Sequence, residues 1–287
     1  MAKTGDIKRR IRSVHSTKKI TKAMEMVAAA KLRKMQQRVV AARPFAEKLQ
    51  EVMGRLVAHM EDFQHPLLDV RERKKVAYVL FTGDRGLCGG YNSNIIRLAE
   101  SSLNQEEADS SLILVGRKGR EYFRRRNYPI TETFSDIGDE PGFIQAREII
   151  ARILNYYQDG TFDEVRLVYT KFRTAISQEP SDIKLLPLES PQAAEEVEAG
   201  VSDYIYEPSA EGVLKELLPK YVENYFYHAL LESKTSEHGA RMTAMGSASQ
   251  NAEEMIDKLT MMYNRARQAA ITTEISEIVG GAEALNK

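Results

Sequence analysis

A glycine-rich segment is the part of the sequence best placed for small-molecule chemistry. It reads Gly83-Asp84-Arg85-Gly86-Leu87-Cys88-Gly89-Gly90, and it lies between a predicted strand and a predicted helix, where phosphate-binding loops occur. Its glycine spacing is G-x-x-G-x-x-G-G rather than G-x-G-x-x-G, and no Gly-Lys-Ser or Gly-Lys-Thr follows to hold phosphates and magnesium. The pattern favours a structural interpretation, in which glycines allow a sharp turn and a close approach to a neighbouring element while Asp84 and Arg85 pair locally. Nucleotide binding is the alternative.

Residue types for hydrolysis or metal chemistry are sparse. The segment Gly246-Ser247-Ala248-Ser249 lacks the second glycine of a nucleophile elbow and lies in helical sequence, which disfavours a serine hydrolase. The single cysteine, Cys88, excludes an internal disulfide and a cysteine-based zinc site. The five histidines form no pair at helical metal-ligand spacing. We therefore expect no catalytic residues, no cofactor and no metal site.

The length and composition indicate a soluble chain. With 287 residues, 43% of them hydrophobic, it can form one large domain or two modest ones. No run approaches the roughly 20 apolar residues of a membrane span, and the basic N-terminus lacks a secretory apolar region. We expect the protein to stay in the compartment where it is made, without direct membrane insertion.

The charge is distributed unevenly although the formal net charge is zero. Residues 1–60 hold 15 Lys and Arg against 4 Asp and Glu, a surplus of +11, so the rest of the chain sums to −11. A basic helix of this kind is typical of a chain with an acidic partner, which is nucleic acid, an anionic membrane or an acidic protein surface. A solvated face without a partner is the other interpretation.

Residues 1–62 predict one long helix. Apolar or small residues recur every seventh position, at Ile7, Val14, Thr21, Ala28, Met35, Ala42, Leu49 and Leu56. A second series is apolar except at Lys18 and Glu25, where we expect the pairing to loosen or another group to pack. Pro44 bends this helix without ending it.

Residues 209–287 predict a second long helix, with Ser209 as N-cap and Pro219 as an early interruption. A stripe of small residues predicts close helix approach: Ala229, Ser233, Ser236, Ala240, Ala244, Ser247 and Asn251. The register then shifts to Met255, Leu259, Met262, Ala266, Ala269 and Thr273. Because neither helix is stable alone, we expect the two to bury their stripes against each other.

Residues 75–200 predict a central α/β domain. Buried strands are expected at 76–81, 111–115 and 165–169, with an edge strand at 183–188, and helices at 94–103, 118–126 and 143–157. The predicted fold is therefore α/β, with a long antiparallel coiled coil of the N- and C-terminal helices. The central domain is Rossmann-like with a mostly parallel sheet.

Several segments resemble the gamma subunit of F-type ATP synthases, in one order along nearly the whole chain. The N-terminal signature is similar to residues 19–32, KITKAMEMVAAAKL, and the central loop to residues 84–92, DRGLCGGYN. Residues 203–208, DYIYEP, also match. The C-terminal signature is similar to residues 236–245, SEHGARMTAM, and residues 263–275, YNRARQAAITTEI.

The resemblance implies a non-catalytic central-stalk rotor subunit of bacterial type. Its helical pair would enter a ring of three alpha and three beta subunits, and its base would rest on the membrane c-ring. Ion flow would turn the c-ring, and the shaft would drive the catalytic sites of beta through their conformations to make ATP. The chain would lie at the cytoplasmic face of the bacterial membrane as a peripheral protein.

The resemblance also assigns roles to individual residues. Met24 with Lys22 would face an acidic beta segment, and positions matching packing, beta contact and coupling are Arg241, Arg267, Gln268, Thr272 and Glu274. Tyr204, Tyr206 and Glu207 would form the foot, near the c-ring and the epsilon subunit. The apolar end of the chain would turn in a bearing formed by the ring. A basic coiled-coil nucleic-acid-binding protein is the alternative function.

Overall fold

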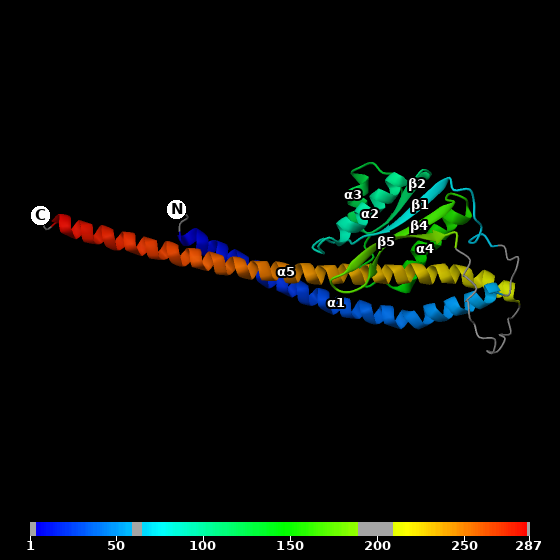
Figure 1. Ribbon diagram of the computed structural model, residues 1–287, viewed down its shortest axis with the longest axis horizontal. Helices are drawn as coiled ribbons and strands as arrows, with labels where there is room; N and C mark the ends of the chain where they lie inside the picture. Colours follow the sequence, from blue (N-terminus) through cyan, green and yellow to red (C-terminus); the bar gives the residue numbers. More distant parts are fainter. Residues whose placement is uncertain (1–3, 59–64, 189–208, 286–287) are drawn as a thin grey trace. The chain divides into compact units, whose positions relative to one another are not determined.

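The computed structural model describes residues 4–58, 65–188 and 209–285, which form two compact units. One unit comprises residues 1–28 and 242–287, and the other comprises residues 29–241. Two long helices, α1 (Thr4–Ala58) and α5 (Ala210–Leu285), contribute to both units (Figure 1). The predicted segments 1–62 and 209–287 are thus each divided between the units, and the predicted foot residues Tyr204, Tyr206 and Glu207 lie outside the described residues.

The long helices continue through both internal prolines. Pro44 lies within α1, as predicted, and Pro219 does not interrupt α5. Ser209 is the N-cap of α5, as predicted. Its Oγ accepts a hydrogen bond from the backbone N–H of Gly212 at 3.1 Å. Among the helices within the described ranges, none has a stretch apolar and long enough to span a membrane.

In the first unit, α1 and α5 run antiparallel. Thr21 Oγ1 accepts a hydrogen bond from Ser249 Oγ at 2.7 Å, and Lys18 Nζ lies 2.8 Å from a carboxylate oxygen of Glu253. Gly246 faces the side chain of Glu25: a Cβ added to Gly246 would lie 3.5 Å from the carboxyl carbon of Glu25. The polar stretch between Lys18 and Glu25 is therefore joined to α5 by polar contacts, where the sequence predicted either looser pairing or the packing of another group.

The buried row of α5 in this unit differs from the predicted one. Ser247 and Asn251 are exposed, and Met255 and Met262 are 51% and 55% exposed. The buried positions are Met245, Ser249 and Ala252, followed by the half-buried Ile256 and by Leu259 and Ala266, which the predicted row contains. The buried row thus departs from the predicted one before Met255, in the stretch where Gly246 lies beside Glu25 and Ser249 donates a hydrogen bond to Thr21.

The second unit contains a five-stranded sheet of order β3-β2-β1-β4-β5. Its strands are β1 (Lys75–Phe81), β2 (Asp109–Val115), β3 (Ile130–Phe134), β4 (Glu164–Phe172) and β5 (Gln178–Leu186). All pairs are parallel except β4 with β5. The parallel strands are joined through α2 (Tyr91–Gln105), α3 (Arg117–Arg124) and α4 (Phe143–Gln158), as expected for right-handed crossovers. The predicted Rossmann-like class with a mostly parallel sheet is confirmed.

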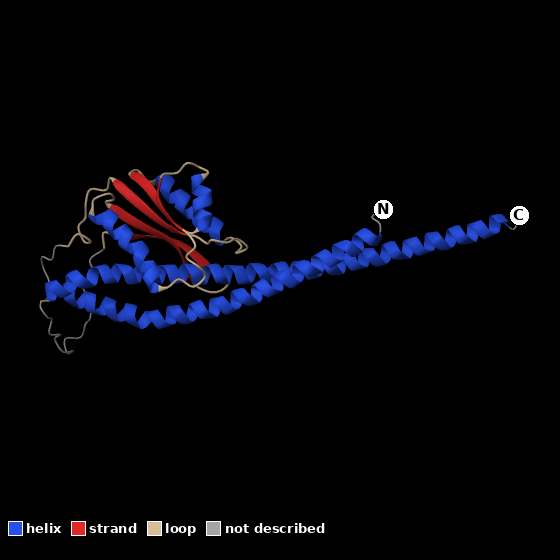
Figure 2. Cartoon of the chain, turned by 180° about the vertical axis from the view of Figure 1, so that it is seen from behind, coloured by secondary structure: helices blue, strands red, loops and turns tan. Residues whose placement is uncertain are grey.

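Alternating residues of the strands build a core on each face of the sheet. In β1, Val76, Tyr78 and Leu80 pack in a core with α2 and α3. The intervening residues of β1 pack in the larger core, with α4, α5 and the Leu49 and Met53 side chains of α1. Figure 2 shows these helices on the two sides of the strands. The central strand β1 is therefore covered on both faces, which explains its continuous apolar sequence.

Two strands differ from the sequence prediction. Strand β3, with sequence ITETF, was not predicted because its residues alternate between half-buried and exposed and it lies at the sheet edge. Strand β5 covers residues 178–186 rather than 183–188, and its first residues are largely polar. Edge strands need only one apolar face, so they lack the apolar run that reveals central strands.

An acidic segment after β3 pairs with basic residues of α1. Lys31 Nζ forms an ion pair with Asp139, and Lys34 Nζ lies 2.7 Å from Glu140 Oε2. Arg38 also lies 3.2 Å from Glu140 Oε2. Part of the basic surplus predicted to meet an external partner is therefore neutralised within the chain.

We predict that Phe226→Ala lowers the free energy of unfolding by about 3–5 kcal/mol, the usual cost of removing a fully buried aromatic side chain. Phe226 is fully buried and packs edge-on against Phe81, with ring centroids 5.1 Å apart. Urea denaturation followed by circular dichroism measures the change. The control Ile176→Ala removes a side chain of a residue that is 83% exposed and should cost no more than about 0.5 kcal/mol. Equal effects of both variants would contradict the packing.

We predict that Asp139→Asn destabilises the chain at neutral pH but not in acid. Burial opposes ionisation of Asp139, yet the Lys31 ammonium holds its pKa below the usual value. A lowered folded-state pKa stabilises the protein above the ordinary Asp pKa of about 3.9, and that stability is lost as pH falls through the folded value. Urea midpoints of both proteins between about pH 7 and pH 2 should converge on acidification. A difference that stays constant over this range would contradict the ion pair.

Candidate functional site

The loop between β1 and α2, residues 82–90, contains the glycine-rich segment. It follows the carboxyl end of β1, which lies between β2 and β4 where the strand order reverses, the usual ligand position in doubly wound sheets. Asn92 closes the loop: its Oδ1 accepts from the Gly83 N–H at 2.8 Å, and its Nδ2 donates to the Arg85 carbonyl at 3.3 Å. The loop is thus held by its own hydrogen bonds.

Asp84 serves the start of α3. Among the residues that the structure describes, no ion pair joins Asp84 to Arg85, although the sequence predicted one. The Asp84 carboxylate instead accepts a hydrogen bond from the backbone N–H of Arg117 at 2.9 Å. Thr82 Oγ1 accepts another from the N–H of Gly119 at 3.0 Å. The first N–H groups of a helix have no partners within it, so these contacts attach the loop to α3.

Helix α5 packs against the loop at Gly83. A Cβ on Gly83 would lie 3.0 Å from the side-chain carboxyl carbon of Glu237, so glycine permits the close approach that the sequence predicted. A nucleotide phosphate bound at this loop would meet the negative charge of Glu237. The Gly83 N–H, which a phosphate would need as a donor, is already bonded to Asn92. The geometry therefore gives no support to the nucleotide-binding alternative.

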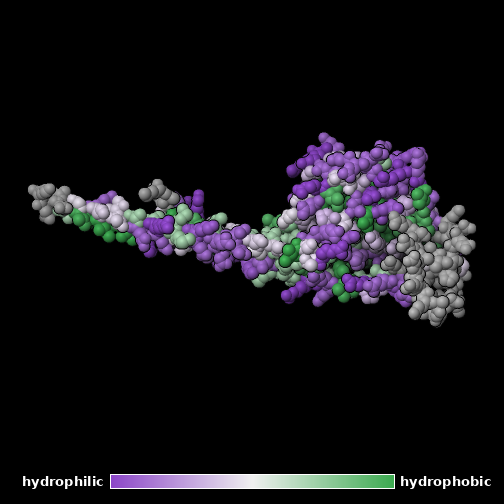
Figure 3. Space-filling model, in the orientation of Figure 1, coloured by the Kyte–Doolittle hydropathy of each residue, from purple (hydrophilic) through white to green (hydrophobic). Residues whose placement is uncertain are grey.

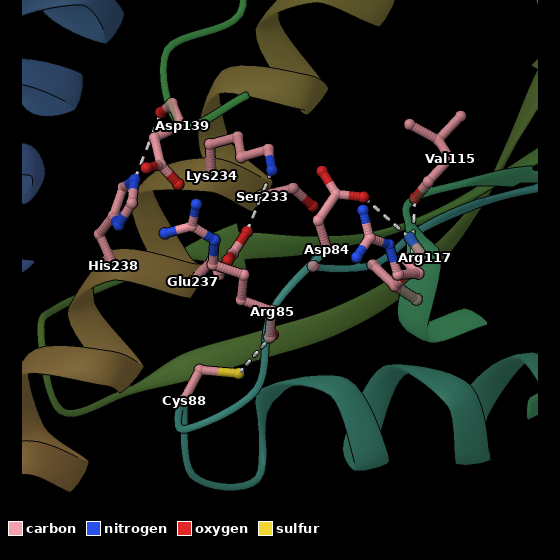
Figure 4. A network of polar contacts seen from close by, with 12 residues as sticks. Asp84, Arg85, Cys88, Val115, Arg117, Asp139, Ser233, Lys234, Glu237 and His238 are labelled. Carbon is pink, nitrogen blue, oxygen red and sulfur yellow. Dashed lines mark hydrogen bonds and ion pairs between the residues drawn. The ribbon is translucent and has the colours of Figure 1, made fainter. Parts of the chain in front are cut away.

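Four ionisable residues on one side of α5 are buried, and Glu237 and Arg241 among them contact this loop. Lys234, Glu237, His238 and Arg241 recur at helical spacing on one side of α5, and their exposed fractions are 5%, 2%, 1% and 9%. Glu237 accepts hydrogen bonds from Arg241 Nη2 at 2.7 Å and from Lys234 Nζ at 3.2 Å. Arg241 Nη2 also lies 3.4 Å from the carbonyl oxygen of Gly86. Figure 4 shows Lys234 and Glu237 directed toward the loop.

The cluster consists of a carboxylate between two cations. Burial opposes ionisation of Glu237, but Lys234 and Arg241 hold its pKa below the usual value. Burial lowers the pKa of His238, so this imidazole is neutral at pH 7. Burial also raises the pKa of the nearby Cys88 thiol, which keeps it in the unreactive protonated form. These residues are arranged to hold elements together rather than to transfer protons.

A polar cavity of about 250 Å³ lies beside the cluster. Its lining carries four acidic and three basic side chains and one glycine: Asp84, Asp136, Asp139, Glu237, Arg85, Arg117, Lys234 and Gly138. Most of these charges are paired with one another or with α1. Within the described part of the chain, no group of three or more His, Cys, Asp or Glu residues could hold a metal ion.

The structure separates the residues singled out by the resemblance. Arg241 belongs to the buried cluster in the second unit. In the first unit, Lys22 is exposed and pairs with Glu25 at 3.0 Å, while Met24 is half-buried. The remaining four, all exposed on α5 in the same unit, are Arg267, Gln268, Thr272 and Glu274.

Sequence reasoning missed Lys234 and Glu237 as parts of the site. Glu237 lay within the recognised signature SEHGARMTAM, but only Arg241 was singled out there. A signal was present, since two cations flank one carboxylate at helical spacing in a stretch otherwise rich in small residues. Asp139 carries no such signal, because its partner Lys31 lies more than one hundred residues away along the chain.

Known proteins match this chain over nearly its full length. The family model described as ATP synthase matches residues 3–285. The ATP synthase gamma chain of Moorella thermoacetica is 58% identical over 285 residues, which cover 99% of this chain and 100% of the relative. That of Heliobacterium modesticaldum is 55% identical, covering 98% of each chain.

Solved structures agree with the sequence relatives. A chain from the central stalk and c-ring structure of the Tetrahymena thermophila mitochondrial ATP synthase is 28% identical, with a TM-score of 0.61. The match covers 80% of this chain and 99% of that one. A rotor chain of the Euglena gracilis mitochondrial enzyme, at 22% identity and a TM-score of 0.64, shares the fold over 93% of this chain. By its sequence and its fold, the chain belongs to the ATP synthase gamma chain family.

Proposed function

We propose that the protein is the non-catalytic rotor of the central stalk of an ATP synthase. Its shaft would turn inside a ring of three alpha and three beta subunits, whose beta subunits carry the catalytic sites, while its base rests on the c-ring and contacts epsilon. Rotation of the c-ring by ion flow would thereby drive ATP synthesis. Two findings support this assignment: the chain matches ATP synthase gamma chains over nearly its full length, and its structure is similar to a chain from a central-stalk structure.

The unpaired end of α5 is the observation that carries the proposal. At the register set by Lys18 and Glu253, the first described residue of α1, Thr4, lies level with about residue 267 of α5. Every residue of α5 from Arg267 to Ala282 is exposed. Figure 1 shows α5 continuing past the N-terminal end of α1. A single helix of this length is marginal in water, so it needs a surrounding partner.

The exposed end of α5 carries an apolar row suited to such a partner. Ile271, Ile275 and Ile278 follow helical spacing and are 47%, 56% and 66% exposed, and Val279 is 57% exposed. Figure 3 shows apolar surface on this part of the helix. An uncharged row can turn within a ring of subunits without breaking a fixed set of ion pairs. We therefore propose that it turns in an apolar bearing formed by the ring.

The shaft presents different residues on different sides, as coupling requires. A rotor changes the conformation of a catalytic subunit only by interacting differently with its alternative states. We propose that Lys22 and Met24 face an acidic segment of beta, and that Arg267, Gln268, Thr272 and Glu274 form further coupling contacts. Their exposed or half-buried positions support this role. Arg241 would contribute from its buried cluster.

The base and the location of the protein complete the proposal. Tyr204, Tyr206 and Glu207 would contact epsilon and the c-ring. The protein would lie at the cytoplasmic face of a bacterial membrane, as a peripheral subunit of the complex. Bacterial gamma chains among the relatives support this location.

The relatives give no support to the nucleic-acid-binding alternative, and the charges reduce its basis. Lys18, Lys31, Lys34 and Arg38 are each paired with a carboxylate of the chain itself. These pairs reduce the free positive charge available for phosphates.

Purification from membranes tests the proposal. The tagged full chain, isolated under mild detergent, should carry alpha and beta in three copies each for one copy of itself, identified and counted by mass spectrometry. Recovery of the chain without these subunits, from membranes that hydrolyse ATP, would contradict the assignment.

We predict that Met24→Lys uncouples the complex. It places a second ammonium two residues from Lys22 on a half-buried position of α1, and a new ion pair with an acidic beta segment would resist rotation. ATP-driven proton pumping per ATP hydrolysed, measured in membrane vesicles, should fall by about fivefold, as expected for roughly 1 kcal/mol of added interaction. The matched control Ile176→Lys adds the same charge at an exposed position of the other unit and should leave this ratio unchanged. Wild-type coupling in Met24→Lys would contradict the contact.

A further inference from the structure

Arg241 is held from two sides by groups that belong to different parts of the second unit. Its Nη2 lies 2.7 Å from Glu237 Oε1, one helical turn earlier on α5, and 3.4 Å from the carbonyl oxygen of Gly86 in the loop 82–90. A guanidinium is planar, so fixing one edge on a carboxylate directs its remaining N–H groups. The position of Arg241 relative to the loop therefore depends on Glu237.

Glu237 is a rigid support for this purpose. Its side chain is 3% exposed, lies 3.2 Å from Lys234 Nζ and packs against the backbone at Gly83. A buried carboxylate that satisfies two cations is costly to displace, because each cation would be left without its counter-charge. Glu237 is thus fixed by Lys234 and by the loop that Arg241 also contacts.

Other nearby groups do not replace it. His238 Nδ1 lies 3.3 Å from Arg241 Nη1, but burial lowers the pKa of this imidazole, so the ring is neutral and offers a hydrogen-bond partner without a counter-charge. The carboxylate of Asp139 is paired with Lys31. Within the described residues, Glu237 is the carboxylate hydrogen-bonded to Arg241.

We propose that Glu237 is a positioning residue for coupling, which holds Arg241 against the Gly86 carbonyl and so fixes the loop 82–90 on α5. This inference rests on the proposed function, which gives Arg241 a role in coupling. It adds that Arg241 has this role only in the orientation that Glu237 imposes. Lys234 assists by holding the carboxylate in place.

The single cysteine of the chain reports on the loop. Cys88 is 2% exposed, lies within the loop and packs with Tyr91 and with Ala240 of α5. A thiol at this position reacts with Ellman's reagent only when the loop opens, so its reaction rate measures loop opening. Because the chain has one cysteine, the signal is unambiguous.

Glu237→Gln in the isolated full chain should raise the rate of Cys88 modification by about tenfold or more, since loss of the charge releases Arg241 from the loop. Arg241→Met should have a similar effect, and the double variant should react no faster than either single one. The matched control Glu232→Gln makes the same change on the same helix, at a carboxylate that is half-buried beside His228, and should leave the rate unchanged.

Glu237→Asp keeps the negative charge that balances Lys234 and tests the idea if Glu237→Gln does not fold, as judged by circular dichroism. The carboxylate is then withdrawn by one methylene and loses its contact with Arg241, so Cys88 should again react faster. Wild-type rates in a folded Glu237 variant, with a raised rate in Arg241→Met, would overturn the positioning role.

Coupling measured in the assembled complex separates this inference from the proposed function. Glu237→Asp and Arg241→Met should lower the ratio of proton pumping to ATP hydrolysis to the same extent, without additivity. Normal coupling in Arg241→Met would contradict the proposed role of Arg241 alone, and the Cys88 rates would still test how the loop is held. Impaired coupling in Arg241→Met with normal coupling in Glu237→Asp would overturn the inference about Glu237.

Discussion

The antiparallel contact between α1 and α5 is the interaction on which the rest of the molecule depends. The two helices come from opposite ends of the chain, and neither has enough local stability to persist in water at such length. In the first unit they are joined by polar groups, at Thr21 with Ser249 and Lys18 with Glu253, as well as by buried apolar residues. Polar cross-links fix the register, whereas an all-apolar seam would permit sliding.

In the second unit the same two helices form part of the core of an α/β domain. Leu49 and Met53 of α1, and Phe226 of α5, are buried with one face of the sheet. The crevice that binds ligands in many doubly wound sheets is here packed by Glu237 against Gly83. Many proteins with this fold bind nucleotides at the loop after the first strand. Here the same loop packs against α5, which suits a subunit without catalysis.

The central strands could be predicted from sequence because they are apolar on both faces, as in Val76–Phe81. The edge strand β3 could not, since its polar residues alternate with half-buried ones. The sequence wrongly predicted that Met255 and Met262 lie on the face of α5 that contacts α1, because apolar character alone does not say which face meets α1. The contacts that accompany this register, Gly246 with Glu25 and Ser249 with Thr21, join residues far apart in sequence.

The candidate site was predictable only in part, for a similar reason. The Gly83–Gly90 segment and Arg241 stand out in the sequence, and the expectation of a close approach at the loop is confirmed by Gly83. Their connection through Glu237, and the pairing of Lys31 with Asp139, arise from tertiary packing. Local patterns identify candidate residues, but the fold determines which of them meet.

Direct observation of rotation tests the central claim, that this chain turns as a shaft. A label attached through Ile176→Cys uses a position that is 83% exposed, while Cys88 stays buried. With the proposed ring of alpha and beta subunits immobilised on a surface, ATP should make the label rotate in one direction, pausing three times per turn. A label that stays still while the same complexes hydrolyse ATP would contradict the account.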